Sequence, residues 1–259
     1  MGGAAGAAAR GGARGRVHVR LERTERGPLR IGHRGAAALA PANSLEAVEA
    51  ALALGVDGVE IDVVSVEGRL VAAHSPAEAA PESPALDEVL ALLAASEAFV
   101  LCDVKASGRE AELLGLLRAH GLAERTVVAS FLPEVLRAAA EHELGLVLAR
   151  SYPDDRHGIS ERLPGAAIDA GLAGLRLALP YRIGRMLEAS GASVATLHHG
   201  VVSRALVERC HGRDVAVLAW TVNDAEALAR VEALGVDGVI TDDPRIFDGA
   251  VTLDSDTGA

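Results

Sequence analysis

The stretch that decides the fold is Val56-Asp57-Gly58-Val59-Glu60-Ile61-Asp62-Val63-Val64. Its apolar residues predict a buried strand, yet Glu60 and Asp62 stand two residues apart within it. Side chains at positions i and i+2 of a strand point to the same face. Two carboxylates on one face of a buried strand are costly unless a cation satisfies them. We therefore expect a divalent metal, which prefers hard oxygen ligands, beside this strand.

This strand belongs to a regular alternation of strands and helices. Elements alternating at this spacing pair as parallel strands through crossover connections. Eight strands fit a closed (β/α)8 barrel, an α/β fold that typically needs about 250 residues; the chain has 259. The predicted strands are residues 29–33, 57–63, 98–104, 126–130, 145–149, 193–197, 215–220 and 238–241, with an extra extended piece at 69–74. The predicted helices end at 54, 95, 120, 142, 211 and 234, and two further helical pieces cover 160–171 and 180–190.

An internal repeat supports closure of the barrel. The run Ala53-Leu54-Gly55-Val56-Asp57-Gly58-Val59 recurs letter for letter at 233–239. Each copy has the form of a helix end, a glycine cap and a strand start. The two copies therefore belong to equivalent units of the barrel, which puts Asp242 at the height of Asp62. We expect Asp242 to anchor the loop into Asp243-Pro244 rather than to bind metal.

The whole-chain composition bounds the domain organisation and the partners. We expect one barrel domain over residues 29–249, a disordered or weakly ordered Gly/Ala/Arg-rich segment at 1–28, and a tail at 250–259. The net charge of −11 argues against nucleic acid and against electrostatic attachment to anionic membranes. No run is apolar enough for stable membrane insertion or for a signal peptide, so the cytoplasm is the expected location. Two cysteines provide no disulfide framework.

Candidate metal ligands gather at the carboxyl ends of the predicted strands, where (β/α)8 enzymes place their active sites. Glu60, Asp62 and Asp103 can form a cup of three acids for Mg2+ or Ca2+; buried salt bridges to arginines are the alternative. Arg34 and Lys105 would bind a phosphate, Arg34 with a planar fork and Lys105 as a point charge. Lys105 is the only lysine among 25 basic residues, which indicates that a compact ammonium is wanted there.

Two histidines flank the acidic strand. His33 precedes it and His74 follows it. Imidazole titrates near neutral pH, so the pair would act as general base and general acid on an anionic substrate. Trp220 is either a wall of the substrate pocket or part of the core. Asn43 is either a helix cap or an active-site amide, and the cap is the favoured interpretation.

These residues resemble the glycerophosphodiester phosphodiesterase family, whose barrel is similar to that of phosphatidylinositol phospholipase C. The resemblance covers about Leu29 to Phe247. It rests on His33-Arg34-Gly35, Pro41-Ala42-Asn43-Ser44, Gly55 to Asp62, Val71-Ala72-Ala73-His74, Asp103-Val104-Lys105, Ala219 to Asp224 and Gly235 to Asp242.

The resemblance implies metal-dependent hydrolysis of glycerophosphodiesters to an alcohol and glycerol 3-phosphate. It implies that His33 and His74 are the acid–base pair, and that Glu60, Asp62 and Asp103 hold the metal. The attacking oxygen would be either a glycerol hydroxyl, giving a cyclic phosphate, or water. The substrate would be a small phosphodiester; the head group and the oligomeric state stay open.

The chain departs from the family pattern at three positions. Ala42 stands where the family usually has Glu, Ser75 where Asp usually follows the second histidine, and Asp103 where the third metal ligand is usually Glu. Two alternatives stay open. One is a related phosphodiesterase acting on lysophospholipids, which an apolar rim formed by Leu172, Leu175, Leu177, Leu179 and Tyr181 would favour. The other is a barrel that binds phosphodiesters without turnover, which the three departures support.

Overall fold

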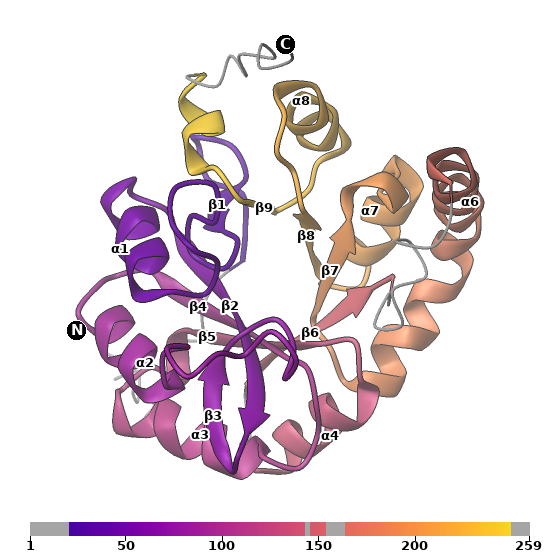
Figure 1. The fold of residues 1–259 in the computed structure, drawn as a ribbon. Helices are drawn as coiled ribbons and strands as arrows, with labels where there is room; N and C mark the ends of the chain where they lie inside the picture. Colours follow the sequence, from indigo (N-terminus) through magenta and orange to yellow (C-terminus); the bar gives the residue numbers. More distant parts are fainter. Residues whose placement is uncertain (1–20, 143–145, 154–163, 250–259) are drawn as a thin grey trace, which may run out of the picture.

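Eight parallel strands close into a barrel in the computed structural model, which describes residues 21–142, 146–153 and 164–249. β1 pairs with β2 on one side and with β9 on the other, which closes the ring. Figure 1 shows the helices surrounding these strands. The predicted (β/α)8 fold is confirmed. The barrel strands are β1 Leu29–Gly32, β2 Gly58–Val66, β4 Phe99–Val104, β5 Thr126–Ser130, β6 Val147–Tyr152, β7 Val194–His198, β8 Ala216–Trp220 and β9 Gly238–Thr241.

The piece expected at 69–74 is not a barrel strand. β3, Arg69–Ala72, pairs antiparallel with the last part of β2 and forms a hairpin with it. The turn at Glu67-Gly68 has a positive φ at both residues, 49° and 77°. This conformation is easier for glycine than for other residues. The hairpin lengthens β2 beyond the barrel and brings the chain back to the end of the acidic strand.

The helices pack their apolar faces on the outside of the barrel. The large core cluster lies between strands and helices, and it includes the fully buried Leu86, Leu90, Leu113 and Leu117. Spacing of apolar residues at three and four positions gives each helix such a face. The helices are α1 Leu45–Ala53, α2 Leu86–Ala94, α3 Glu110–Ala119, α4 Pro133–His142, α6 Gly165–Ser190, α7 Arg204–His211 and α8 Ala225–Leu234, with short 3-10 turns η1 Ala123–Arg125, η2 His199–Val201 and η3 Pro244–Asp248.

Two sequence predictions between β5 and β7 were wrong. The expected pair of helical pieces is one helix, α6, that continues through Pro180. Proline removes one N–H and crowds the preceding turn, but residues 173–179 are rich in the strong helix formers Ala, Leu and Arg. β6 extends to Tyr152 rather than ending at 149, because Ser151 and Tyr152 still pair with β7. Residues 160–163 of the first predicted piece lie outside the described part of the chain.

Apolar side chains fill the barrel interior below the carboxyl ends of the strands. This plug includes Ile31, Leu101 and Leu218. Two positions further along the same strands stand His33, Asp103 and Trp220. Since alternate residues of a strand face the same side, the interior changes from apolar to polar at one end of the barrel. That end is the mouth.

The Asp of the internal repeat, Asp57 in one copy and Asp237 in the other, has a structural role at the end of the barrel opposite to the mouth. Asp57 accepts a hydrogen bond from the backbone N–H of Arg30 at 2.8 Å, and Asp237 accepts one from Val217 at 2.7 Å. Each carboxylate therefore fixes the start of a neighbouring strand. Asp57 also pairs with Arg26 at 2.9 Å. The internal repeat thus marks two equivalent units of the barrel.

The chain before β1 covers the base of the barrel. Leu21 is only 6% exposed and packs against the apolar plug. Leu21, in the segment that the sequence suggested to be weakly ordered, thus contributes to the core, whereas residues 22–26 are exposed. The predictions for 1–20 and 250–259 lie outside the described residues. Over the described ranges, we find no helix with the length and apolar character needed to cross a bilayer.

Candidate metal and catalytic site

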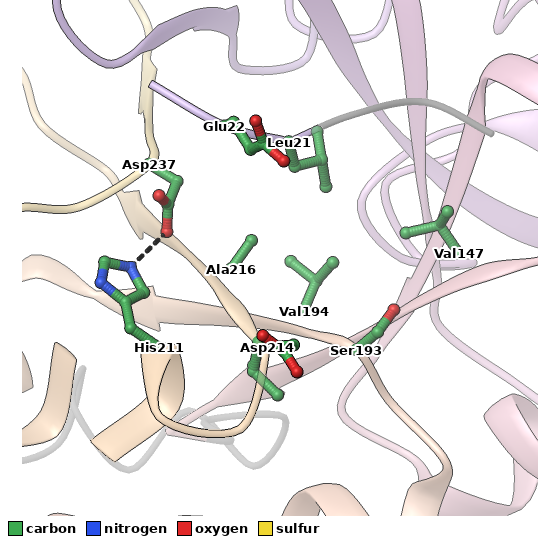
Figure 2. A pocket seen from close by; sticks show the side chains of 10 residues that line it. Leu21, Glu22, Val147, Ser193, Val194, His211, Asp214, Ala216 and Asp237 are labelled. Atoms are coloured by element: carbon green, nitrogen blue, oxygen red, sulfur yellow. Dashed lines mark hydrogen bonds and ion pairs between the residues drawn. The ribbon is translucent and has the colours of Figure 1, made fainter. Parts of the chain in front are cut away.

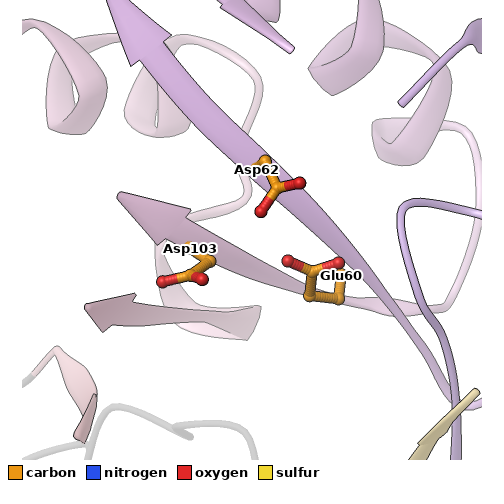
Figure 3. Close-up of side chains that lie close together, drawn as sticks. All are labelled: Glu60, Asp62 and Asp103. Atoms are coloured by element: carbon orange, nitrogen blue, oxygen red, sulfur yellow. The ribbon is translucent and has the colours of Figure 1, made fainter. Parts of the chain in front are cut away.

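Three buried carboxylates meet at the mouth. Glu60 and Asp62 come from β2 and Asp103 from β4, where Asp62 and Asp103 are register partners. One carboxylate oxygen from each lies within 4.8 Å of the others. Figure 3 shows the three side chains turned toward a common space. The sequence predicted this cup, and among the described residues it is the one group of three or more acids, histidines or cysteines with this geometry.

Both predicted phosphate-binding cations lie against Asp62. Lys105 Nζ is 2.5 Å from one carboxylate oxygen and Arg34 Nε is 2.9 Å from the other. Lys105 also donates to Asp103 at 2.6 Å. Burial alone would raise the pKa of Asp62, but Lys105 and Arg34 outweigh it and bring that pKa to about 2. Asp62 is therefore ionised at any physiological pH.

Asn43 bonds to the acid Asp62 rather than to the end of a helix. Its side chain donates to Asp62 Oδ2 at 3.0 Å and accepts from the Asp62 backbone N–H at 3.1 Å. Ser44 caps α1 instead, accepting from Ala47 N–H at 3.1 Å. The favoured cap interpretation of Asn43 was therefore wrong. Asn43 and Arg34 both have positive φ, 64° and 52°, a conformation that costs energy in non-glycine residues and often marks functional sites.

His33 stands beside Glu60. Its Nε2 is 4.0 Å from Glu60 Oε2, and the same oxygen accepts the backbone N–H of Arg34 at 2.8 Å. Burial, followed by the charge of Asp62, raises the pKa of Glu60 to about 7. Without a further cation, the site therefore holds Glu60 close to protonation at neutral pH.

The other ring nitrogen of His33, Nδ1, contacts the carboxylate of Asp242. Asp242 Oδ1 is 2.6 Å from His33 Nδ1, and Asn223 Nδ2 donates to Asp242 Oδ2 at 2.5 Å. Asn223 Oδ1 also accepts from the Asp242 backbone N–H at 3.0 Å. The expected role of Asp242 as a loop anchor was wrong, because Asp243 does that work by capping η3. With Nδ1 donating to Asp242, Nε2 of His33 is the nitrogen that faces the acids.

His74 follows the β2–β3 hairpin. The backbone N–H of Ala73 donates to the carbonyl of Asp62 at 3.3 Å. This bond holds the backbone just before His74 against the acidic strand β2. Its Nδ1 lies 2.9 Å from Glu78 Oε1. Of the two histidines, His33 contacts an acid of β2, and His74 contacts Glu78.

Rings line the side of the mouth formed by β5, β7 and β8. Trp220 meets Phe131 and His198 edge to face, with centroids 6.0 and 5.3 Å apart. Burial, then the charges of His199 and Arg230, lower the pKa of His198 to about 4, so it is neutral at physiological pH. Lys105 Nζ lies 5.7 Å from the Phe131 ring centre and connects this side to the acids. Trp220 thus contacts these rings and also packs against the apolar plug, which agrees with the core interpretation as well as with the pocket wall.

The acids of the mouth fit a hard divalent cation. Asp103 Oδ1 is buried with no hydrogen-bond partner, so it is available as a ligand. Three carboxylates against the Lys105 and Arg34 cations leave a local excess of negative charge. Oxygen donors of this kind are those that Mg2+ and Ca2+ take. The residues present therefore suit the metal that the sequence predicted.

A hollow at the other end of the barrel has a different character. It is lined by residues at the amino ends of β6, β7 and β8, among them Val147, Val194 and Ala216, and by His211 and Asp237. Figure 2 shows the ion pair of His211 with Asp237, at 2.8 Å. Asp237 is already committed to the start of β8. Since barrel enzymes act at the carboxyl ends of their strands, we assign the hollow to the structural base.

Comparisons with known proteins agree with the site. The family model described as "Glycerophosphoryl diester phosphodiesterase family" matches residues 33–89 and 180–246. A glycerophosphodiester phosphodiesterase of Caldanaerobacter subterraneus subsp. tengcongensis is 25% identical over 258 residues, covering 84% of this chain and 95% of that protein. The chain belongs to the glycerophosphoryl diester phosphodiesterase family.

Solved structures of this family share the fold. An Oleispira antarctica phosphodiesterase in complex with the product sn-glycerol-3-phosphate superimposes with a TM-score of 0.67 at 20% identity, covering 86% of this chain and 96% of that one. A glycerophosphodiester phosphodiesterase of Parabacteroides distasonis gives a TM-score of 0.66 at 18% identity, covering 86% and 97%. These similarities support the barrel.

One departure noted in the sequence has an acid close to it in the structure. Ser75 follows His74 where the resemblance implies Asp. Glu78 supplies a carboxylate to His74 from four residues further on. A spacing of four within a tight turn was the available sequence signal. Asp242 was also missed as the partner of His33, and Asn223 as the partner of Asp242, although Asp242 directly follows a barrel strand like other site residues.

Proposed function

We propose that this protein hydrolyses glycerophosphodiesters to an alcohol and glycerol 3-phosphate, with a divalent metal and two histidines. The observation that carries the proposal is the buried cup of Glu60, Asp62 and Asp103 with His33 Nε2 4.0 Å from Glu60. The relative named glycerophosphodiester phosphodiesterase aligns over 95% of its own length. The Oleispira antarctica phosphodiesterase was solved with sn-glycerol-3-phosphate as its product.

The three acids would hold Mg2+ or Ca2+. When bound, such an ion neutralises negative charge on phosphoryl oxygens. Arg34 and Lys105 would bind the same phosphate, Arg34 through two parallel donors and Lys105 as a point charge. Both now contact Asp62. Both cations therefore lie beside the acids, where a phosphate bound to the metal would be.

The histidines would divide the proton transfers. Asp242 accepts from Nδ1 of His33 and leaves Nε2 free to take a proton from the attacking hydroxyl or water. His74 would give a proton to the oxygen of the departing alcohol as the phosphorus–oxygen bond breaks. The ring side of the mouth, with Trp220, would contact the uncharged part of the substrate.

A metal panel against several glycerophosphodiesters tests the proposal. We expect release of glycerol 3-phosphate, seen by phosphorus NMR, only when Mg2+, Ca2+ or another divalent ion is present. His33→Ala should reduce turnover by at least about a hundredfold, since general acid–base catalysis contributes roughly 10²–10⁴-fold. Glu60→Gln should abolish metal-dependent turnover, because it removes a carboxylate ligand of the ion. Binding of the diester without product under every metal condition would instead support a non-catalytic barrel and overturn the proposal.

One observation favours lysophospholipids as a second substrate class. Leu177 and Tyr181, one helical turn apart on α6, are 77% and 79% exposed. Leu172 of the same helix reaches to within 3.1 Å of the position that a Cβ on Gly200 would take, at the mouth end of β7. Exposed apolar side chains of this kind suit contact with the acyl chain of a lipid substrate. Comparing glycerophosphocholine with lysophosphatidylcholine would decide, because the second substrate class predicts faster release from the lipid.

A further inference from the structure

We propose that Glu78 is a positioning residue for His74 and fixes the ring so that Nε2 protonates the leaving alcohol. The inference rests on the proposed function. Glu78 has no counterpart in the pattern that the resemblance describes, where an acid directly follows the second histidine. It would take the place of that acid from three residues further along the chain.

The contacts at Glu78 converge on one oxygen. Oε1 lies 2.9 Å from His74 Nδ1 and accepts from Ser75 Oγ at 3.0 Å. Nε2 of His74 makes no hydrogen bond within the described residues, so it is the ring nitrogen available to a substrate. A histidine whose Nδ1 is held by an acceptor has a defined tautomer and ring orientation. Glu78 therefore determines which nitrogen of His74 points to the reaction.

The turn after His74 fixes Glu78 independently of His74. The backbone N–H groups of Glu78 and Ala79 both donate to the carbonyl of Ser75 at 3.1 Å. Glu78 N–H also lies 3.3 Å from Ser75 Oγ. A single tight turn thus brings the carboxylate of Glu78 back to the ring. Ser75 occupies the family's acidic position and here ties the replacement acid in place.

The exposure of the pair argues against a role in stability. The side chains of His74 and Glu78 are 45% and 58% exposed, and ion pairs in water contribute little to folding. Hydrogen bonding to His74, then to Ser75, lowers the pKa of Glu78, and the nearby Arg34 acts in the same direction. Glu78 is therefore an anionic acceptor at neutral pH, on the side of the acids where Arg34 lies.

Two esters of glycerol 3-phosphate test this role. Glycerophosphocholine releases an alkoxide that needs a proton, whereas the p-nitrophenyl ester releases a stable phenolate that does not. We expect Glu78→Leu to reduce kcat for glycerophosphocholine by about tenfold and to leave the p-nitrophenyl ester within about twofold. Glu78→Gln keeps an acceptor oxygen and should recover part of the loss. Glu82→Gln, an exposed acid of the same loop, serves as the matched control and should match the wild type on both esters.

Each other outcome has a definite meaning. Equal losses on both esters in Glu78→Leu, or no loss on either, would overturn the positioning role, since a damaged fold would affect both leaving groups alike. Failure of the wild-type protein to hydrolyse either ester with any metal would instead overturn the proposed function, and this inference with it.

Discussion

Asp242 is the residue whose removal should separate proton transfer from metal binding. It accepts from His33 Nδ1 but is not part of the acidic cup. We predict that Asp242→Asn lowers kcat by about 10–100-fold, because His33 loses the partner that sets its tautomer. Calorimetry should show unchanged affinity for the divalent ion. Asp248→Asn, which changes an exposed acid paired with Arg30, is the control, and a large loss of metal affinity in Asp242→Asn would contradict this role.

Glu60 should make the metal-free fold sensitive to pH. Burial and Asp62 raise its pKa from 4.5 to about 7, so between these values the folded state binds more protons than the unfolded one. Stability without metal should therefore fall as pH rises through this window. We predict that Glu60→Gln unfolds like the wild type in urea and chelator near about pH 5 but is more stable near about pH 8, by on the order of 3 kcal/mol at most. Lower stability of the variant at both pH values would rule this out.

The strand starts at the base of the barrel depend on the repeated Asp. Asp57 and Asp237 each accept a backbone N–H of a neighbouring strand. Replacing either by Ala leaves that N–H without its partner, which costs about 1–3 kcal/mol. We predict this loss in denaturant unfolding for each variant, with kcat unchanged, because the base is remote from the mouth. A selective loss of kcat at full stability would contradict the division between a structural base and a catalytic mouth.

The sequence predicted the elements better than it predicted their contacts. Apolar runs and glycine caps located the eight strands, and the i, i+2 rule placed Glu60 and Asp62 on one face. Tertiary contacts decided the rest. Asn43 is a residue type that often caps helices, yet the neighbouring Ser44 caps α1. The Asn43 side chain instead donates a hydrogen bond to Asp62.

Long-range partners and long helices were the weak points. The bond between His33 and Asp242 joins residues 209 positions apart, and local pattern carries no information on such a pair. The two helical pieces predicted at 160–171 and 180–190 belong to one helix, α6, because the helix formers between them continue it through the buried Pro180.

The mouth as a whole is divided into a charged side and a ring side. The acids and cations come from β2, β4 and the segments beside them, whereas Phe131, His198 and Trp220 follow or end β5, β7 and β8. We predict that Trp220→Leu raises KM for a glycerophosphodiester by about tenfold, equivalent to about 1.4 kcal/mol, and changes kcat much less. Steady-state kinetics of Phe247→Leu provide the control. The Phe247 ring packs against the Arg30 guanidinium rather than against the rings of the mouth, so this variant should keep the KM of the wild type. A fall in kcat alone would show that Trp220 acts on the reaction rather than on binding.

Metal binding should stabilise the entire barrel, because its ligands tie together two neighbouring strands of the closed sheet. Asp62 on β2 and Asp103 on β4 are register partners, and an ion that binds only the folded state adds RT ln(1 + [L]/Kd) to stability, about 2.7 kcal/mol at a hundredfold excess over Kd. For a domain of this size, each kcal/mol raises Tm by about 2–4 °C. We therefore predict a rise of about 5–10 °C in calorimetry with saturating Mg2+ or Ca2+, abolished in Asp62→Asn and Asp103→Asn and retained in Glu82→Gln. A rise that survives both ligand substitutions would place the stabilising ion elsewhere on the chain.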